Sequence, residues 1–392
     1  MVRMTDSLLE AASHSVSPAD IVGSPLHEIF KQPFLLGLFL PIQNGGWSAS
    51  TLPRSTDWHF DYNKALTLKA EALGLDLVFG LAQWNPKGGH GGEMRYREDS
   101  LDPFMVTAAL ASVTTRILLI STIHVLYGPW HPLHLAKFGA TLDSITGGRW
   151  GINVVTGNLE SHARMFGKAQ IEHATRYRMA EEFAAFLKTY WHSEETFSAQ
   201  GEFWSTENAY VSPRPKFGRP IMVNAAGSVP GIEYATRHSD LVFITSPAGA
   251  EIEAALGALP AHCGQIQAAA ARQGRVLRTL INPMVICRPT EREAWDYHDA
   301  IVAAQDRTAV DNFFASAQAR DSHSFRGAQR DQKAVGGNIQ LVGSPAQIVE
   351  YLLRLQAAGC DGVQLTFYDF EADLAYFGEA VLPLLKQAGL RI

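Results

Sequence analysis

Neutral polar side chains end or interrupt several apolar runs of this chain. The clearest case is Asn153, which lies between Ile152 and Val154 in an uncharged run. A strand that only fills a core has no use for an amide, because a buried polar group is costly without a hydrogen-bond partner. Similar side chains stand in or after the other runs: Gln43, Asn44, Gln83, Ser121, Thr122, His124, Thr156, Asn224, Ser228, Thr366 and Tyr368.

These residue types favour binding of a reactive group over direct catalysis by the protein. The set contains no carboxylate pair of the glycosidase kind, no G-x-S-x-G nucleophile motif and no His/Asp cluster for a metal. Amides and hydroxyls match the polar edge of an aromatic cofactor, and such a cofactor would supply the reactivity.

The segment "AAGSVPGI", residues 225–232, has the composition of a phosphate site. Small residues lead into a helical pattern, and the free N–H groups and dipole at a helix start favour a phosphate. Arg176 and Tyr177 open another helical segment and are candidates for a cation and a hydroxyl on the same phosphate. The alternative for Arg176 is an ordinary surface position. "GGHGG" at 88–92 lacks nucleotide-binding spacing and is expected to form a loop over the site.

Eight short apolar runs must position these groups. They start near residues 34, 74, 116, 150, 220, 240, 280 and 361, and segments with apolar residues at three- and four-residue spacing lie between them. Strands that alternate with helices and are apolar on both faces indicate a parallel sheet, and eight units predict a (β/α)8 barrel. The alternative is a doubly wound open sheet. In a barrel the groups that do chemistry lie at the carboxyl ends of the strands.

Three segments depart from this alternation. Residues 1–32 are expected to form a loosely ordered extension, and residues 33–392 the barrel domain. Residues 194–216 carry aromatic and β-forming residues with Gly and Pro, which predicts a small hairpin. Residues 303–340 are polar and contain glycine, which predicts a long mobile loop, either a lid or a surface loop.

Composition narrows the class of protein. Hydrophobic residues make up 46% of the chain and charged residues 18%, as in globular proteins. The net charge of -6 comes from interspersed charges, which argues against nucleic-acid and membrane partners and favours a small molecule. Cys263, Cys287 and Cys360 are odd in number and far apart, so we expect neither a disulfide framework nor a metal site. A reducing cytoplasm is expected.

Several motifs resemble the bacterial luciferase-like, flavin-dependent monooxygenases. They are "STDWHFDYNKAL" (55–66), "GPWHPLHLAKFGATLDSITGGRWGINVVTG" (128–157), "HATRYRMAEEF" (173–183), "GEFWSTENAYVSPRP" (201–215) and parts of 341–385. The resemblance runs from about Phe34 to the end. Within the family the chain is most similar to dimethyl sulfone and pyrimidine ring-opening monooxygenases, and less similar to alkanesulfonate monooxygenases.

The resemblance implies an oligomeric (β/α)8 barrel, a homodimer or homotetramer, that takes reduced FMN (FMNH2) from a separate NAD(P)H-dependent flavin reductase. Molecular oxygen is the second substrate. Thr122 and Asn153 match residues near flavin N5 in the pyrimidine branch. The matched FMN-contact positions are Ala82, Gln83, His162, Arg176, Tyr177 and Ser228. That branch has a lysine at Gln83 and a glutamate at His162, so the flavin's pyrimidine edge is expected to be held differently here.

Other positions bear on the substrate. The alkanesulfonate branch has an arginine and a histidine where this chain has Asn282 and Met284, which counts against a charged sulfonate. Tyr368 matches a tyrosine of that branch and either orients substrate or donates a proton, or packs on the barrel rim. His124 is a candidate for the pocket or a structural histidine. Trp47, Trp84 and Trp130 are candidates for an apolar pocket wall or for the core.

The resulting prediction is a two-component monooxygenase that oxygenates a small neutral substrate, first of all an organosulfur compound such as a sulfone. The alternative is ring opening of a pyrimidine or heterocyclic amide, with the oxygen carried at flavin N5. Two rivals remain: a deazaflavin-dependent hydride-transfer enzyme on the same barrel, and a catalytically silent flavin-binding protein.

Overall fold

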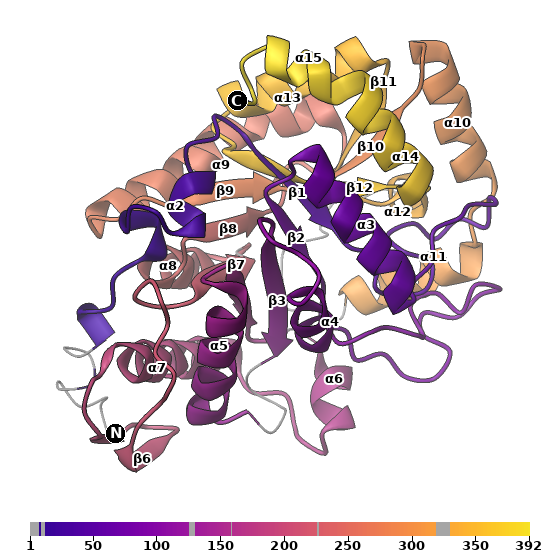
Figure 1. Cartoon of the computed structure of the whole chain (residues 1–392). Helices are drawn as coiled ribbons and strands as arrows, with labels where there is room; N and C mark the ends of the chain where they lie inside the picture. The colour runs from indigo at the N-terminus through magenta and orange to yellow at the C-terminus, as the bar shows by residue number, and fades with distance from the viewer. Residues whose placement is uncertain (1–7, 9–11, 125–129, 158, 226, 319–329) are drawn as a thin grey trace.

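A closed barrel of parallel strands forms the centre of the molecule (Figure 1). The computed structural model describes residues 8, 12–124, 130–157, 159–225, 227–318 and 330–392. The strands follow the order β1-β2-β3-β4-β7-β8-β9-β12, and β12 pairs with β1. Their bounds are β1 Leu35–Phe39, β2 Leu77–Phe79, β3 Leu118–His124, β4 Trp150–Val155, β7 Ile221–Ala225, β8 Leu241–Ile244, β9 Arg278–Ile281 and β12 Gly362–Phe367.

The eight predicted strands are all present, and the prediction of a (β/α)8 barrel is confirmed. The strands are almost wholly buried because their side chains face either the barrel interior or the surrounding helices. The register of β1 on β12 runs from Leu35 opposite Gly362 to Leu38 opposite Leu365. This pairing leaves no free edge at β1, so the open-sheet alternative is wrong.

Helices surround the barrel and follow its strands along the chain (Figure 1). At Gly139 of α5 a Cβ atom would lie 2.9 Å from the ring of Trp150, so glycine allows this helix to approach β4 closely. The helices of the main body are α3 Phe60–Leu73, α4 Pro103–Leu110, α5 Pro132–Thr146, α6 Glu160–Met165, α7 His173–His192, α8 Val229–His238, α9 Ile252–Arg272, α13 Pro345–Ala357, α14 Phe370–Tyr376, η2 Phe377–Val381 and α15 Leu382–Gln387.

Two segments extend the barrel. Residues 194–216 contain the antiparallel pair β5 (Phe197–Gln200) and β6 (Ser205–Ala209). After β9 the chain continues as β10 (Pro283–Cys287), α10 (Glu291–Ala303), α11 (Arg307–Gln318), α12 (Arg330–Val335) and β11 (Ile339–Gly343). Strand β11, which the sequence reading did not predict, pairs in parallel with β10.

The prediction of one long loop over residues 303–340 is wrong for its described part, because α11 and α12 are helices. Residues 319–329 lie outside the described residues. Val310 and Phe313 of α11 are buried against Tyr96 in a second, smaller core cluster. These apolar positions sit within a mostly polar stretch, so the helical pattern was not apparent in the sequence.

The N-terminal extension packs on the barrel in its described part. It contains η1 (Pro18–Asp20) and α2 (Pro25–Ile29), and Leu8 and Leu26 are buried. The Ser17 hydroxyl donates to the Asp240 carboxylate at 2.6 Å. The expectation of a loosely ordered extension therefore does not hold for these residues, because apolar burial and this hydrogen bond fix them.

Buried ion pairs stabilise the amino-terminal end of the barrel. The two guanidinium nitrogens of Arg219 each lie 2.7 Å from a carboxylate oxygen of Asp240, just before β8. Arg391 pairs likewise with Asp76, just before β2, and Asp76 also accepts the backbone N–H of Leu36 at 2.7 Å. Each carboxylate is paired with a guanidinium and also accepts a backbone N–H, which lowers the cost of burying the ion pair.

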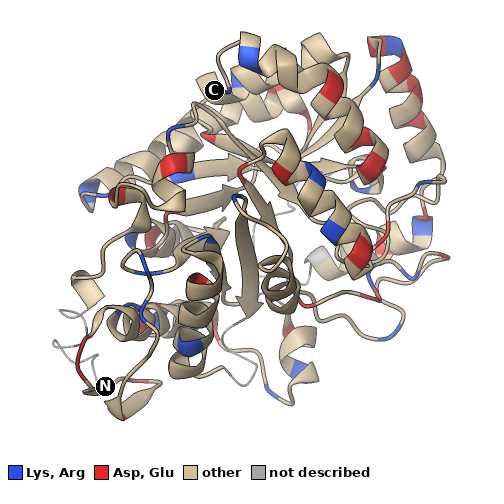
Figure 2. Cartoon of the chain, in the orientation of Figure 1, with Lys and Arg blue, Asp and Glu red and all other residues tan. Residues whose placement is uncertain are grey.

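Charges of both signs are interspersed over the outer helices (Figure 2). None of the described helices combines the length and apolar character that a membrane span requires. The described residues also contain no group of three or more His, Cys, Asp or Glu placed to hold a metal ion.

Candidate active site

A cavity of about 300 Å³ opens at the carboxyl ends of the barrel strands. This is the end at which barrel enzymes place their active sites. Each of the eight barrel strands contributes a residue to the lining: Phe39 from β1, Phe79 from β2, His124 from β3, Asn153 from β4, Asn224 from β7, Phe243 from β8, Leu280 from β9 and Gln364 from β12.

Most of the predicted site residues meet in this cavity. Those that line it are Ala82, Gln83, Asn153, His162, Arg176, Tyr177 and Ser228. Thr122 lies directly beside the lining, where its hydroxyl accepts an N–H from the Asn153 amide at 3.2 Å. Strands β3 and β4 are in register at this pair, with Thr122 opposite Asn153. Thr122 therefore contacts Asn153, which lines the cavity, without lining the cavity itself.

Asn153 presents an amide oxygen that the protein leaves unused. Its side chain is 1% exposed, and its Oδ1 has no hydrogen-bond partner among the described residues. Leaving a buried acceptor unsatisfied costs about 1–3 kcal/mol. A ligand N–H in the cavity would remove that cost.

Other polar atoms around the cavity also lack a hydrogen-bond partner among the described residues. Asn224 donates to the Val154 carbonyl at 2.8 Å, which leaves its Oδ1 without a described partner. Gln83 accepts from Asn85 at 3.4 Å, and its Nε2 has no partner within the described residues. The Nε2 of Gln364 and the Nδ1 of His124 are also unsatisfied there. Donors and acceptors spaced around one cavity match a planar heterocycle with several polar edge atoms, as in a flavin.

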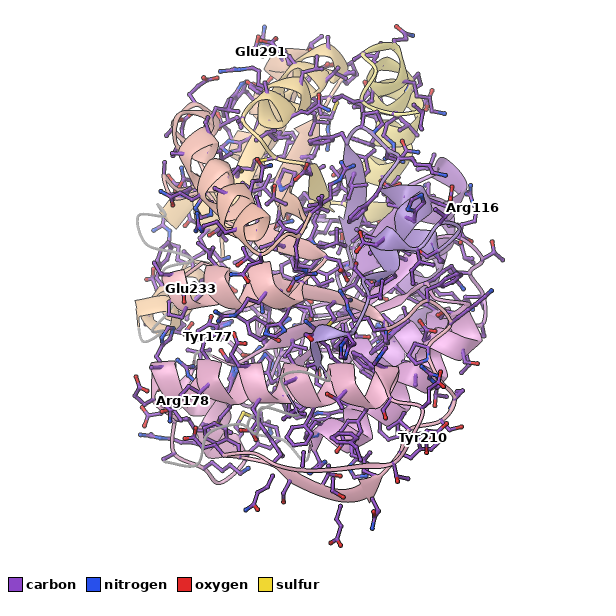
Figure 3. The ribbon with its side chains drawn as sticks, turned by 90° about the vertical axis from the view of Figure 1, so that its left-hand side faces the viewer. Arg116, Tyr177, Arg178, Tyr210, Glu233 and Glu291 are labelled. Carbon is purple, nitrogen blue, oxygen red and sulfur yellow. The ribbon has the colours of Figure 1, made fainter. Side chains whose placement is uncertain are left out.

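One side of the cavity has the features of a phosphate site. Ser228 caps the ten-residue helix α8, and its hydroxyl accepts the N–H of Gly231 at 3.3 Å. The Tyr177 hydroxyl lies 3.5 Å from the Ser228 hydroxyl, and Figure 3 shows Tyr177 on α7 facing the neighbouring helix α8. Arg176 is 1% exposed and donates to the carbonyl of Gly157. Hydroxyls, a cation and a helix N-terminus converge here.

Gly231 is required for this approach. A Cβ atom at this position would lie 2.7 Å from the Tyr177 hydroxyl and 3.2 Å from the Ser228 hydroxyl. A larger residue at this position would therefore require the Tyr177 hydroxyl to shift away from Ser228.

His124 is held neutral at the rim. Burial, and secondarily the nearby His162, lowers the pKa of His124 to about 3. The two rings are stacked with centroids 5.8 Å apart. At neutral pH the His124 ring therefore offers one donor and one acceptor, and carries no charge.

Tyr368, another candidate for catalysis, also does not line the cavity. Its side chain is fully buried, and its hydroxyl donates to the carbonyl of Leu52 at 2.7 Å. The Arg54 guanidinium lies 4.3 Å from its ring. Strand β12 ends at Phe367, so the chain has already turned away from the barrel axis at Tyr368. Tyr368 holds the loop after β1, which agrees with the alternative of packing on the barrel rim and not with a role in proton transfer or substrate orientation.

Of the three candidate tryptophans, one lines the cavity and two do not. Trp47 lines the cavity, and its ring packs on Phe39 with centroids 3.8 Å apart. Trp84 is 39% exposed and contacts Phe166, and Trp130 packs on Phe104; neither is part of the lining.

Sequence reasoning missed several lining residues. They are Asn85, Arg97, His173, Lys333, Asn338 and Gln364, whereas His90 belongs to the loop 88–92 that was expected over the site. Gln364 is the one with a detectable signal, because it is an amide inside the apolar run of β12, as Asn153 is in β4. Most of the others lie on loops or in α12, where no periodicity relates them to the barrel.

A family model and individual relatives both point to the same kind of protein. The family model "luciferase-like monooxygenase" matches residues 35–362. An FMNH2-dependent dimethylsulfone monooxygenase from Pseudomonas fluorescens (strain Pf0-1) is 31% identical over 366 residues, which cover 91% of this chain and 96% of that protein. A pyrimidine monooxygenase from Allorhizobium ampelinum is 30% identical over 369 residues, covering 90% and 96%.

Solved structures show the same fold. A riboflavin lyase, solved with modified FMN and riboflavin, has a TM-score of 0.80 at 22% identity and covers 92% of this chain and 93% of that one. DmoA from Hyphomicrobium sulfonivorans has a TM-score of 0.78 at 18% identity, covering 91% and 89%.

The buried neutral His124 predicts a pH dependence of stability. An unfolded histidine titrates near 6.5 and His124 near 3, so the unfolded chain binds more protons between these values. The stability that depends on neutral His124 is complete above pH 6.5 and is lost as the pH falls towards 3. Between pH 6 and 5 the free energy of unfolding of the wild type should fall by up to about 1.4 kcal/mol per pH unit more than that of His124→Asn. Urea unfolding measures both free energies.

His134→Asn, an exposed position on α5, is the matched control and should keep the wild-type slope. Equal slopes for wild type and His124→Asn would show that His124 does not need to be neutral in the fold.

Proposed function

The chain belongs to the luciferase-like monooxygenase family, and from this premise we propose that it uses reduced FMN and molecular oxygen to oxygenate a small organic substrate. The observation that carries the proposal is one cavity with a phosphate site on one side and unsatisfied amide atoms on the other. When bound, reduced FMN supplies the electrons and activates the oxygen.

The phosphate of FMN is assigned to the start of α8. Ser228 and Tyr177 supply hydroxyl donors, and Arg176 supplies positive charge beside the helix N-terminus. Hydrogen bonds to a charged group are about twice as strong as neutral ones, so this end supplies much of the affinity. The three residues hold the cofactor and take no part in oxygen transfer.

The polar edge of the flavin ring is assigned to the strand ends. Asn153 hydrogen-bonds at the N5 edge through its unused Oδ1, and Thr122 fixes the orientation of that amide. Ala82, Gln83 and His162 line the cavity on neighbouring elements and are assigned to the pyrimidine edge. Because a lysine and a glutamate of the pyrimidine branch are replaced by Gln83 and His162, this edge is held by neutral side chains.

Aromatic side chains close the inner end of the cavity to water. The ring of Phe79 lies 4.6 Å from Phe39 and 4.6 Å from Phe243, and Trp47 packs on Phe39. Excluding water keeps activated oxygen for the substrate and suppresses its loss as hydrogen peroxide.

Two substrate classes are proposed for the reacting group. A sulfone comes first, because a relative at 31% identity is named for dimethylsulfone and because Asn282, after β9, and Met284, in β10, carry no charge. A pyrimidine or heterocyclic amide is the alternative, supported by the relatives named pyrimidine monooxygenase. Delivery of reduced FMN by a separate flavin reductase, a homo-oligomeric state and a cytoplasmic location complete the proposal; they rest on the family resemblance.

The experiment that tests this function is product analysis with reduced FMN and labelled oxygen. The purified protein is supplied with dimethyl sulfone, methanesulfonate and uracil in parallel, and products are analysed by mass spectrometry. One labelled oxygen atom is expected in an organic product. Formation of peroxide alone with every substrate would favour the catalytically silent flavin-binding protein. Reduction of a deazaflavin, with no use of FMN, would favour the hydride-transfer enzyme.

Removal of the Asn153 amide should separate cofactor binding from oxygen transfer. Loss of one positioned hydrogen-bonding group in an active site lowers turnover by about 100- to 1000-fold, so Asn153→Ala should lower product formation by at least about tenfold and raise the fraction of oxygen released as peroxide. Thr122→Val, which removes the partner of that amide, should give a smaller effect in the same direction. Full activity of Asn153→Ala, with a normal peroxide fraction, would contradict its assignment.

The phosphate assignment predicts a difference between two forms of the cofactor. Ser228→Ala and Tyr177→Phe should each weaken binding of FMN about tenfold or more, because each removes a hydrogen bond to a charged group. Riboflavin carries the same ring without the phosphate, so its affinity should stay within about twofold of wild type. Fluorescence titration measures both. Equal weakening of FMN and riboflavin would place the phosphate elsewhere.

A further inference from the structure

Arg97 is a buried cation at the cavity that the assignment of FMN does not use. It lies on the loop between β2 and α4, lines the cavity and is 5% exposed. Its guanidinium lies 4.8 Å from the ring of Trp47, 5.0 Å from Tyr96 and 5.6 Å from Phe313. Its φ of 61° is uncommon for a residue with a side chain, so the loop holds it in one conformation.

The Arg97 guanidinium makes no ion pair or hydrogen bond with any residue that the structure describes, and its Nε is buried without a partner. Two other buried arginines of this chain have several hydrogen-bond partners: Arg149 donates to the carbonyls of Thr146 and Ile117, and Arg391 pairs with Asp76. The cavity lining contains no Asp or Glu within the described ranges. The surrounding rings stabilise the guanidinium through cation–π contacts, and an anion bound in the cavity would add the ion pair that the described residues do not supply.

This cation lies across the barrel from the phosphate site. Trp47 and Arg97 follow β1 and β2, whereas Ser228 follows β7, which lies four strands from β1 in either direction around the closed barrel. The FMN phosphate is already served by the start of α8. The Arg97 side of the cavity is therefore available to substrate.

Other contacts hold this side of the cavity together. Lys333 of α12 also lines the cavity, with its Nζ 3.8 Å from the Phe313 ring that Arg97 approaches. The Asn312 amide donates to the carbonyl of His90 at 2.8 Å, which joins α11 to the loop of Arg97. Figure 1 shows this loop running beside α11. Two cations from distant parts of the chain thus border one apolar, aromatic space.

We propose that the Arg97 side of the cavity is a carboxylate subsite, so that the substrate carries an anionic group besides the neutral sulfone or amide that reacts. A planar guanidinium matches a carboxylate in two parallel hydrogen bonds. The inference rests on the proposed function and refines its substrate. Asn282, which follows β9, and Met284, in β10, carry no charge; the cation is supplied instead by Arg97 from the loop after β2.

The test compares pairs of compounds that differ in charge and hardly in shape. Methanesulfonylacetate is compared with methanesulfonylacetamide, and orotate with orotamide, which covers both classes of reacting group. Binding is measured by calorimetry under anaerobic conditions to the full chain saturated with reduced FMN. At least one carboxylate should bind about tenfold or more tightly than its amide, the range expected for charge-assisted hydrogen bonds. Binding of neither carboxylate more tightly than its amide overturns the subsite.

Variants assign the preference to Arg97. Arg97→Met keeps an apolar stem among the surrounding rings and should abolish the preference, while Arg97→Lys should keep part of it. Arg95→Met, an exposed position on the same loop that pairs with Glu98, is the matched control and should behave as wild type. Binding of FMN to Arg97→Met should stay within about twofold of wild type.

Two further results would contradict the subsite. One is an undiminished preference for carboxylate in folded Arg97→Met. The other is a tenfold loss of FMN affinity in that variant without any preference in wild type, which would assign the cation to the flavin. Because binding is measured without turnover, failure of the subsite is distinct from failure of oxygenation: the proposed function fails when no labelled oxygen enters any product.

Discussion

Pairing of β1 with β12 closes the sheet, and the site depends on that closure. In a closed parallel barrel the carboxyl ends of all strands form one ring, so residues far apart in the chain face a common space. Arg97 and Ser228 meet the same cavity although 131 positions separate them in the sequence. The amino-terminal end is fixed by buried ion pairs such as Arg219 with Asp240. Stability and binding are thus concentrated at opposite ends.

The two ends differ in how their polar groups are satisfied. Asp76 and Asp240 each accept several hydrogen bonds from the protein, whereas Asn153 and Asn224 each leave an oxygen without a described partner. An unsatisfied buried group persists only where the rest of the fold supplies enough stability. At the carboxyl rim a flavin and its substrate would complete these bonds, which couples ligand binding to stability.

The barrel and much of the site could be predicted because both depend on local pattern. Apolar runs identify strands buried on both faces, and Asn153 is conspicuous because it interrupts one. The two alternatives for Tyr368 could not be separated, because the chain bends one residue past Phe367 and no spacing in the sequence marks that bend. Arg97 was missed because its partners Trp47 and Phe313 come from segments 50 and 216 positions away in the sequence. Such loop contacts depend on tertiary packing, which periodicity does not encode.

The central claim is that one cavity holds FMN with its phosphate at the start of α8 and its ring edge at Asn153. A crystal structure of the protein with FMN tests it most directly. The account predicts phosphate oxygens within hydrogen-bond distance of Ser228 and Tyr177, and the flavin N5 edge beside the Asn153 amide. A flavin bound outside the carboxyl rim, or with its phosphate against Arg97 and its ring turned away from Asn153, would contradict the account.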